Sequence, residues 1–338
     1  MESEAVQRQA IEDEQRDIMR WLTVKVGNAS KAARKFARHG MLILKCSAKR
    51  VHCFDMAAIQ AIAAECAELE TRICTRLREL GVQYSGFSEM GKQDVARLLE
   101  DERLRSFKFA EVSSRCLGRL DIKLPVDLVD RYLGPACSAP PWQEAVEAIL
   151  GGRDECKLAY CGLISSFPGS FHQPFHGDGP HLFGNSLQVP PHAVNVFVPL
   201  HEITEELGPT EFFPGSHSLD AAAAVGRALS SFISLKQTTS LEILSKCRQH
   251  GVVPLQPLLT PGRDVLLYDY RTVHRGTGNR SQATTRRMLY LLYAKPWFGD
   301  HINFGNASLF AAEATASLLA QQQHNTSDAG SCAGHINM

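Results

Sequence analysis

The stretch DVLLYDYRTVHRGTGNRSQATTRRMLYLLYAK (264–295) contains two apolar runs separated by a segment rich in glycine and polar residues. The runs, 264–270 and 286–295, have the length and apolar character of β-strands, and the glycines mark a turn between them. A strand that leads through a turn into another strand predicts two antiparallel neighbours in a sheet.

Three more strand-like runs precede this stretch: KLAYCGLISSF (157–167), AVNVFVPL (193–200) and TEFFP (210–214). Proline and glycine punctuate the connections, as in FPGS, LGPTE and FPGSH. Short strands with such turn signals predict an antiparallel sandwich or barrel. We therefore expect a mainly β fold class with flanking α-helices, whose β core spans about 155–298.

The remaining segments predict helices around this core. Residues 1–28 are helical in pattern but polar, which indicates a peripheral N-terminal helix, and 54–80 have apolar residues at helical spacing. A mostly helical insert is expected at about 219–250, and long connections of this kind often cover binding sites. We expect one domain over 29–312, followed by a disordered tail at 313–338, where the sequence turns polar and small.

The composition limits the function classes. Of the 338 residues, 44% are hydrophobic and 21% are charged, and 36 basic residues balance 36 acidic ones. A general nucleic-acid binder would carry a basic excess, so neither a nucleic acid nor an acidic membrane surface is expected as a partner. The charged N-terminus has no apolar signal region, and no stretch approaches the ~20 apolar residues of a membrane span. A cytoplasmic location is therefore the default expectation.

The ten cysteines show no CxxC pair and no matching histidine pattern for zinc. Disulfide frameworks belong to small secreted domains, and this chain is neither small nor visibly secreted. We therefore expect most of these cysteines to be reduced thiols packed in the interior.

Candidate metal ligands cluster in FHQPFHGDGPHLF (171–183). His176 and Asp178 stand two residues apart, so in extended backbone both side chains point to one face. An isolated HxD pattern also fits a surface turn, but here a later strand leads into His274, which could supply a third ligand. Two histidines and one carboxylate leave three positions open for a bidentate 2-oxoglutarate and O2, which is the ligand logic of non-haem Fe(II) oxygenases.

Paired arginines follow His274 by about a dozen residues, on the next predicted strand. A guanidinium that reached back to the same cavity would bind the distal carboxylate of 2-oxoglutarate through two parallel hydrogen bonds, which lysine does less well. Strand alternation puts Arg286 on one face with Met288, and Arg287 on the other face with Leu289.

Four segments stand in a fixed order along roughly 160–298: PGSFHQPFHGDGPHLF, VNVFVPLHEITEELGPTEFFPGSH, PGRDVLLYDYRTVHRGTGNRS and RRMLYLLYAKPWF. In this combination they resemble the phytanoyl-CoA dioxygenase (PhyH-like) family of Fe(II)/2-oxoglutarate-dependent oxygenases. The resemblance implies a double-stranded β-helix, also called a jelly roll. It also implies that His176, Asp178 and His274 bind iron and that 2-oxoglutarate is the cosubstrate.

The resemblance also assigns further site residues. Family members usually carry the 2-oxoglutarate-binding arginine two positions before the methionine of the MLY motif, which favours Arg286 here and leaves the adjacent Arg287 as the alternative. Gln173 and Asn195 match positions that often line the cosubstrate site in relatives. His181 could line the substrate pocket, and a structural or surface role is the alternative. Tyrosines alternate on the strand before His274, and one of them, Tyr268 or Tyr270, could face the cavity.

The activity implied by the resemblance is a dioxygenase that hydroxylates, or otherwise oxidises, a small organic molecule with O2 and releases succinate and CO2. Ascorbate is expected to support it. Some relatives are halogenases in which a small residue replaces the carboxylate ligand, so the presence of Asp178 favours hydroxylation or a related oxidation. Two alternatives stay open: an oxygenase of the same fold that desaturates or cyclises its substrate, and a non-catalytic jelly-roll binding protein. No CoA-specific motif is present, so phytanoyl-CoA itself is not implied.

Overall fold

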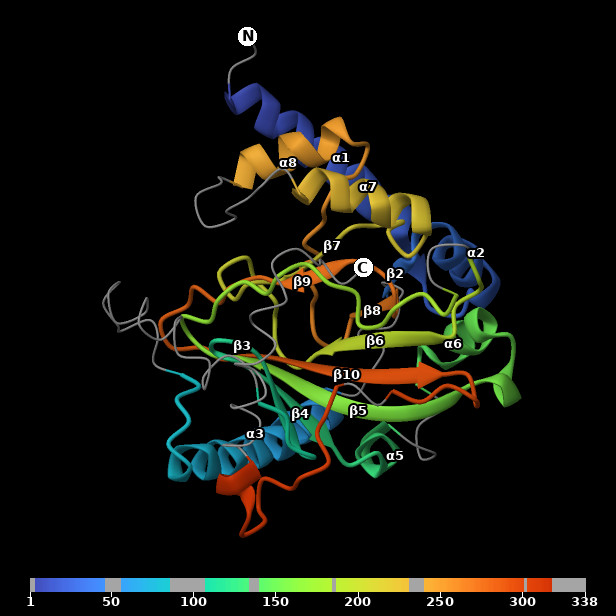
Figure 1. Cartoon of the computed structure of the whole chain (residues 1–338). Coiled ribbons are helices and arrows are strands. Elements are labelled where there is room, and N and C mark those ends of the chain that lie inside the picture. Colours follow the sequence, from blue (N-terminus) through green and yellow to red (C-terminus); the bar gives the residue numbers. More distant parts are fainter. Residues whose placement is uncertain are drawn as a thin grey trace.

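The computed structural model of the chain describes residues 4–45, 56–85, 107–133, 140–183, 187–230, 240–300 and 303–317 (Figure 1). A large sheet and a small sheet form its centre. In spatial order, the large sheet consists of β1 (Thr23–Lys25), β2 (Met41–Lys45), β8 (Asp264–Asp269), β6 (Ala193–Pro199), β10 (Arg286–Ala294), β5 (Lys157–Ser166), β4 (Arg119–Leu124) and β3 (Val112–Cys116). The small sheet pairs β7 (Thr210–Phe212) with β9 (His274–Gly276). The β1–β2 pair is parallel, and the other pairs of these strands are antiparallel. The expectation that 264–270 and 286–295 are antiparallel neighbours is wrong, because β6 lies between β8 and β10 and pairs with both.

The two sheets form the predicted double-stranded β-helix core. Isolated bridges widen the small sheet, because His176 pairs with His274 of β9 and Leu255 pairs with Phe212 of β7. Side chains from both sheets line a cavity between them. The large sheet is open, since its edge strands β1 and β3 do not pair with each other in the described ranges. The expected mainly β core with flanking helices is thus confirmed, and it is a sandwich and not a closed barrel.

Alternation along the central strands gives the large sheet two different faces. On β10, Leu289 belongs to a hydrophobic core that α3 (Met56–Glu79) covers with residues such as Ile62. Met288 and Tyr290 point the other way, into a second cluster on the side of the small sheet. One face of the sheet is therefore a filled core, whereas the other leaves room for a site.

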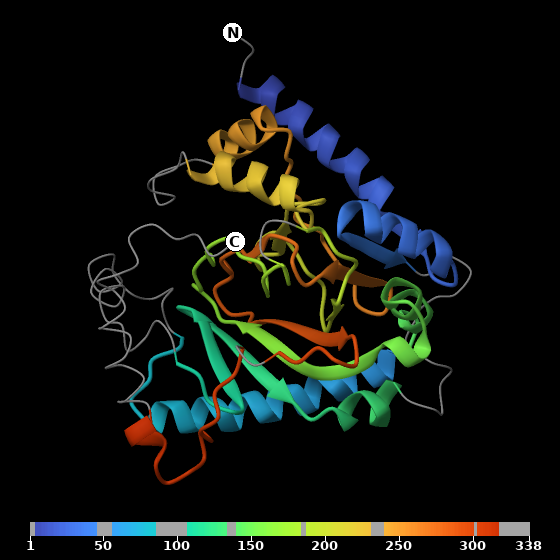
Figure 2. The ribbon, with the colours of Figure 1, turned by 45° about the vertical axis from the view of Figure 1, so that its right-hand side comes forward.

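Helices cover both sides of the sandwich (Figure 2). The remaining helices are α1 (Glu4–Leu22), α2 (Ala29–His39), α5 (Asp127–Leu133), α6 (Gln143–Leu150), the 3-10 helix η3 (Arg153–Glu155), α7 (Leu219–Ser230) and α8 (Ser240–Gln249). α3 and α5 contact each other and lie along the outer face of the large sheet, and α2 packs against α6. α1, α7 and α8 lie together on the side of the small sheet (Figure 1).

The helix predicted at 54–80 is observed as α3, and the described residues of the 219–250 segment form α7 and α8, with 231–239 outside the described ranges. The N-terminal helix α1 leads directly into β1, a strand that the sequence did not predict. Of the tail expected to be disordered, only 313–317 belong to the described residues, and Ala314 is buried in the core. The division into a peripheral helix, one domain and a disordered tail stays a prediction.

Local sequence explains why α2 ends where β2 begins. The Asn28 side chain caps the start of α2 by accepting a hydrogen bond from the backbone N–H of Lys31 (3.2 Å). Gly40 ends the helix in the left-handed conformation, with φ of 65°. A side chain at Gly40 would collide with the His217 ring and approach the Thr272 hydroxyl to 2.8 Å. The helix end therefore packs directly against the loops that lead to the small sheet.

The six cysteines in the described ranges are free thiols. Four of them are buried, and burial raises the pKa of each to about 11 or 12. These four buried thiols are Cys66, Cys74, Cys161 and Cys247.

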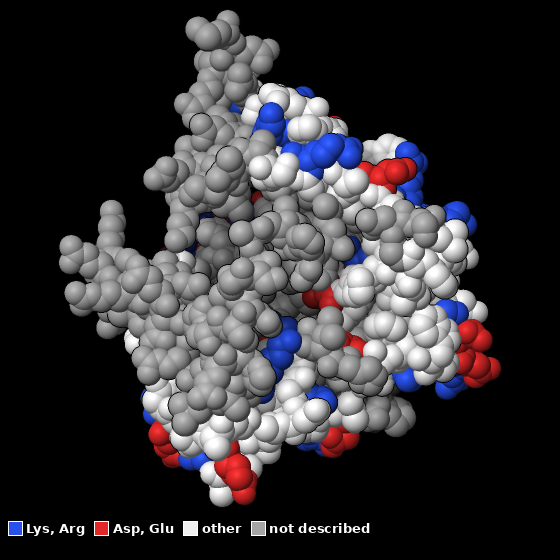
Figure 3. All heavy atoms as spheres, viewed as in Figure 1, with Lys and Arg blue, Asp and Glu red and all other residues white. Residues whose placement is uncertain are grey.

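Charged side chains of both signs are interspersed among the described residues on the face shown in Figure 3. The helices of the described ranges include none that is long and apolar enough to cross a bilayer.

Candidate active site

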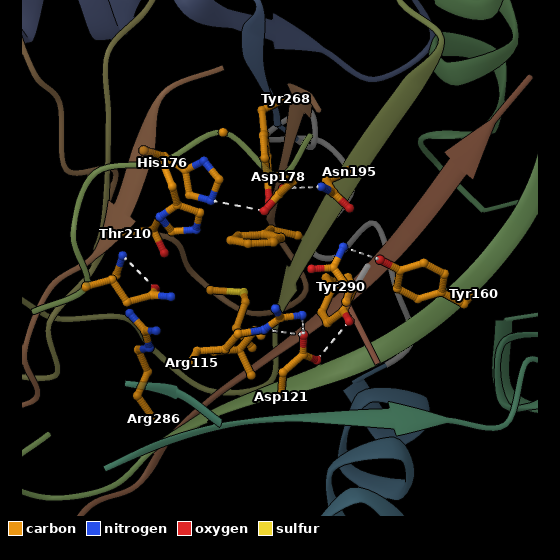
Figure 4. Close-up of a pocket in the computed structure, with 18 of the residues that line it drawn as sticks. Arg115, Asp121, Tyr160, His176, Asp178, Asn195, Thr210, Tyr268, Arg286 and Tyr290 are labelled. Carbon is orange, nitrogen blue, oxygen red and sulfur yellow. Dashed lines mark hydrogen bonds and ion pairs between the residues drawn. The ribbon is translucent and has the colours of Figure 1, made fainter. Parts of the chain in front are cut away.

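A cavity of about 240 Å³ lies between the two sheets. Its lining comes from both sheets, from the loop 173–178, and from Lys108 and Asn303. Figure 4 shows the side chains that point into it. In Figure 4, His176 and Asp178 lie on one side of the cavity, and Arg286, Arg115 and Asp121 lie across it.

The three predicted metal ligands converge in this cavity. One ligand atom from each of His176, Asp178 and His274 lies within 4.8 Å of the others. Nε2 of His274 is 3.6 Å from Oδ1 of Asp178, and the centroids of the two imidazole rings are 4.6 Å apart. The bridge between the strands causes this convergence, because His176 and His274 exchange backbone hydrogen bonds of 2.9 and 2.8 Å. Two imidazoles and one carboxylate on one side of a point suit a divalent transition metal.

Backbone carbonyls orient both imidazoles. Nδ1 of His176 is 2.9 Å from the carbonyl oxygen of Pro174, and Nδ1 of His274 is 3.0 Å from that of Thr272. Since a carbonyl can only accept, the neutral form of each ring carries its proton on Nδ1, which leaves the Nε2 lone pair available to a metal. Burial lowers the pKa of His176 to about 4, and the neighbouring His274 adds to this effect. The His176 ring is therefore neutral near pH 7, as metal binding requires.

One oxygen of the Asp178 carboxylate is fixed by two donors. Nδ2 of Asn195 donates to Oδ2 at 2.6 Å, and the Tyr268 hydroxyl donates to the same oxygen at 2.9 Å (Figure 4). This leaves Oδ1 on the side of His274. Asn195, which the sequence assigns to the cosubstrate site, thus contacts a candidate metal ligand. Tyr268 lines the cavity, and burial raises its pKa well above the ordinary value, so its hydroxyl stays protonated as a donor.

The two neighbouring arginines point to opposite faces of β10. Arg286 is 1% exposed and lines the cavity. Its Nη2 donates to Oγ of Ser166 at 3.0 Å, its Nη1 donates to the carbonyl of Gly208, and its buried Nε has no partner among the described residues. Arg287 faces α3, where Nη2 forms an ion pair of 2.6 Å with Glu70. The placement favours Arg286 over Arg287 as a cosubstrate anchor.

A second buried guanidinium, which sequence reasoning missed, lies beside Arg286. Strand pairing aligns Arg119 of β4 and Arg286 of β10 with the same residue of β5, Ser166. Arg119 donates to the Ser166 hydroxyl at 2.8 Å and to the Gln173 amide oxygen at 2.8 Å. Gln173 therefore lies at the same end of the cavity as the predicted anchor.

Neither of these arginines has an acidic partner among the described residues. Burial, together with the nearby charge of Arg119, lowers the pKa of Arg286 to about 9. Buried charges are normally paired, because an unpaired one costs several kcal/mol of solvation free energy. Two such cations side by side are the arrangement expected of an anion-binding site.

The lining of the cavity also includes an ion pair. Arg115 of β3 donates from Nε and Nη2 to Oδ2 of Asp121, at 3.0 and 2.5 Å, and the Tyr290 hydroxyl donates to Oδ1 of Asp121 at 2.8 Å. Sequence reasoning missed this pair because β3 and β4 lie in the polar stretch VSSRCLGRLDIKL (112–124), where no strand was predicted. The alternation of RLDIKL (119–124) is the signal that could have found it.

Other predicted features lie around the cavity. His181 does not belong to the residues that line it, so a substrate contact by His181 stays a prediction. The helices α7 and α8 pack beside the ligand strands, because Val225 and Cys247 share a hydrophobic cluster with Phe213 and Val273. The helical segment thus supports the metal-binding end from outside.

The sequence model of the phytanoyl-CoA dioxygenase (PhyH) family matches residues 36–288, which include all three candidate ligands and Arg286. The chain belongs to this family. The resemblance seen in the sequence is thereby confirmed, and membership of the PhyH family makes the protein an oxidoreductase of the Fe/2-oxoglutarate-dependent oxygenase class.

Solved structures similar to this PhyH-family chain share little sequence with it. AviO1 from Streptomyces viridochromogenes Tue57 is 18% identical, with a TM-score of 0.46 over 80% of this chain and 97% of that one. SnoK, a non-heme alpha-ketoglutarate-dependent carbocyclase from nogalamycin biosynthesis, is 15% identical, with a TM-score of 0.44 over 78% and 83%. The epimerase SnoN, in complex with Fe3+ and alpha-ketoglutarate, is 15% identical, with a TM-score of 0.41 over 84% and 96%.

Proposed function

We propose that this PhyH-family protein binds Fe(II) through His176, Asp178 and His274 and oxidises a small organic molecule at the expense of 2-oxoglutarate. For a hydroxylation, the substrate RH, O2 and 2-oxoglutarate give ROH, succinate and CO2. One oxygen atom enters the substrate, and the other enters succinate. The observation that carries the proposal is the convergence of the three ligand atoms within 4.8 Å, in the cavity that the unpaired guanidinium of Arg286 also lines.

The donor set fits a non-haem iron site, since two histidines and one carboxylate leave positions open for the cosubstrate and O2. When bound, iron and 2-oxoglutarate supply the oxidising chemistry. The chain's own part is to hold the ligands in place. The carbonyls of Pro174 and Thr272 fix the imidazoles, and Asn195 and Tyr268 fix the Asp178 carboxylate.

We infer that Arg286 binds the distal carboxylate of 2-oxoglutarate. A carboxylate there would pair with a buried cation that has no acidic partner in the described part of the chain, through short charge-assisted hydrogen bonds. Arg119 adds a second positive charge and holds the amide of Gln173. Gly276 leaves space for this group, because a side chain there would collide with Arg119 and come within 2.6 Å of Oε1 of Gln173.

The same ligand set would serve desaturation or cyclisation, and analysis of the product distinguishes these reactions from hydroxylation. A non-catalytic binding protein would need neither three converging ligands nor two imidazoles whose Nε2 atoms are both free to coordinate. The intact and oriented set therefore favours an enzyme over a binding scaffold.

Succinate formation tests this proposal. The purified protein is incubated with Fe(II), ascorbate, 2-oxoglutarate and a pool of small metabolites. We expect succinate that depends on iron and disappears in His176→Ala. A matched control is His250→Ala, at the end of α8 and outside the cavity lining, which should keep full activity. A wild-type protein that binds neither Fe(II) nor 2-oxoglutarate would refute the proposal.

A further inference from the structure

The Arg115–Asp121 ion pair has unused hydrogen-bond donors. Arg115 places both Nε and Nη2 on a single oxygen of Asp121, and its Nη1 donates to no described residue. Asp121 receives Arg115 on one oxygen and the Tyr290 hydroxyl on the other. A guanidinium has five N–H groups, so the surplus at this pair lies in donors. The Arg115 side chain is 20% exposed and points into the cavity (Figure 4).

The charges that line the cavity leave a positive excess. Lys108, Arg115 and Arg286 are basic, whereas Asp121 and Asp178 are acidic. Fe(II) and the two carboxylates of 2-oxoglutarate, if bound as proposed above, cancel each other. The described lining then has three positive and two negative side chains, which is an excess of one positive charge on the side of the protein.

Groups just behind the lining do not alter this balance. Arg119 contacts the lining residue Gln173, and Asp300 accepts a hydrogen bond of 2.5 Å from the lining residue Tyr160. These two charges have opposite signs and offset each other. Over the charged groups of the described residues, a single negative charge on the substrate therefore completes the balance.

The position of this pair separates it from the cosubstrate anchor. Arg286, Met288 and Tyr290 follow one another along the cavity face of β10. Strand register places Asp121 in one row with Ile164 and Met288, two residues along from the row of Arg119, Ser166 and Arg286. Two residues of strand span about 7 Å, so the ion pair lies beside, and not on, the carboxylate that Arg286 would bind. Beside the ion pair the lining is apolar, with Met288, Ile164 and Phe197.

We propose that Arg115 binds a carboxylate of the substrate, and that the substrate is a small monocarboxylic acid whose apolar carbon body lies against Met288, Ile164 and Phe197. Asp121 acts as a positioning residue, since it holds the guanidinium through two hydrogen bonds and is itself held by Tyr290. The inference rests on the proposed function, because Fe(II) and 2-oxoglutarate would occupy the neighbouring part of the cavity.

The test compares acids with their neutral amides on the full chain. The anaerobic complex with Fe(II) and saturating 2-oxoglutarate is monitored by its charge-transfer absorption, and two probe pairs are titrated in: hexanoate against hexanamide, and 3-phenylpropanoate against 3-phenylpropanamide. Each acid should bind about ten- to a hundredfold more tightly than its amide, because charge-assisted hydrogen bonds exceed neutral ones by roughly this factor.

Three variants separate the subsite from general damage. Arg115→Met should lose the preference for acids, and Arg115→Met/Asp121→Asn should lose it too without leaving a buried unpaired carboxylate. Lys123→Met, which removes an exposed cation of β4 outside the cavity lining, should keep the preference. All three should bind 2-oxoglutarate as the wild type does.

The outcomes distinguish this subsite from the proposed function. Equal binding of acid and amide by the wild type, including failure of both to bind, overturns the subsite alone. So does a preference for acids that survives in the double variant. If the wild type forms no complex with Fe(II) and 2-oxoglutarate, the proposed function fails and the subsite fails with it.

Discussion

Replacing Arg286 of β10 by glutamine should weaken 2-oxoglutarate binding without lowering thermal stability. Replacing its neighbour Arg287 should lower thermal stability without weakening 2-oxoglutarate binding. In Arg286→Gln, 2-oxoglutarate loses a buried charged partner. Removing one member of a buried, hydrogen-bonded pair costs about 3–5 kcal/mol, so the Kd for 2-oxoglutarate should rise on the order of 10²- to 10³-fold. In Arg287→Gln the guanidinium that is lost pairs with Glu70 outside the cavity, so the affinity for 2-oxoglutarate should stay unchanged.

The stability of the ligand-free protein should change in the reverse order. Burial disfavours the charged form of Arg286 and lowers its pKa to about 9, so the buried charge destabilises the ligand-free protein. Removing this charge in Arg286→Gln should therefore not lower the melting temperature. Arg287→Gln instead leaves Glu70, whose side chain is 6% exposed, without its charged partner. An unpaired buried carboxylate costs at least about 1–3 kcal/mol, so this variant should melt at a lower temperature.

Thermal melts with Mn(II) in place of iron measure both effects in one experiment. At 100 times its Kd, a ligand stabilises a protein by about 2.7 kcal/mol, and a hundredfold weaker ligand at the same concentration gives only about 0.4 kcal/mol. The stabilisation by 2-oxoglutarate should therefore nearly vanish in Arg286→Gln and persist in Arg287→Gln. If Arg286→Gln keeps it, or Arg287→Gln loses it, the assignment of the anchor is wrong.

Further predictions concern the support of the site. Tyr268→Phe removes one of two donors to Asp178 and should weaken metal binding about tenfold in calorimetry, whereas unchanged affinity would mean that Tyr268 does not position the carboxylate. Gly276→Ala places a methyl group against Arg119 and should weaken 2-oxoglutarate binding while metal affinity is kept, and equal loss of both would point to general unfolding. The four buried thiols, with pKa values raised to about 11 or 12, should resist a thiol reagent at pH 8 in the native protein and react on denaturation, and fast native labelling would contradict their burial.

Strand alternation explains why part of the site could be predicted from the sequence. His176 and Asp178 share a face because they are two residues apart, and Arg286 and Arg287 face opposite ways because they are adjacent. Such relations are local, and any extended strand fulfils them. The approach of His274 needed the order of the family's segments as well, since the bridge with His176 joins positions almost a hundred residues apart.

The register of strand pairing explains which parts of the site could not be predicted from the sequence. Arg119 reaches the cosubstrate site only because β4, β5 and β10 align it with Ser166 and Arg286 in one row. A slip of one residue in either pairing would turn the guanidinium to the opposite face. The alternation of RLDIKL (119–124) signals a strand but does not fix its register, so it could have indicated β4 but not this row.

The two sites in the cavity are built from different parts of the chain, and this has a consequence for specificity. The metal and cosubstrate site depends mostly on the segments 171–178 and 274–286. They contain the His176–His274 bridge and the first residue of β10. The proposed substrate subsite depends on Arg115 and Asp121, from two strands at the edge of the large sheet, of which β4 also carries Arg119. Because these strands contribute none of the three ligands, an exchange of the ion pair for neutral residues should redirect substrate choice while leaving the chemistry at the metal unaltered.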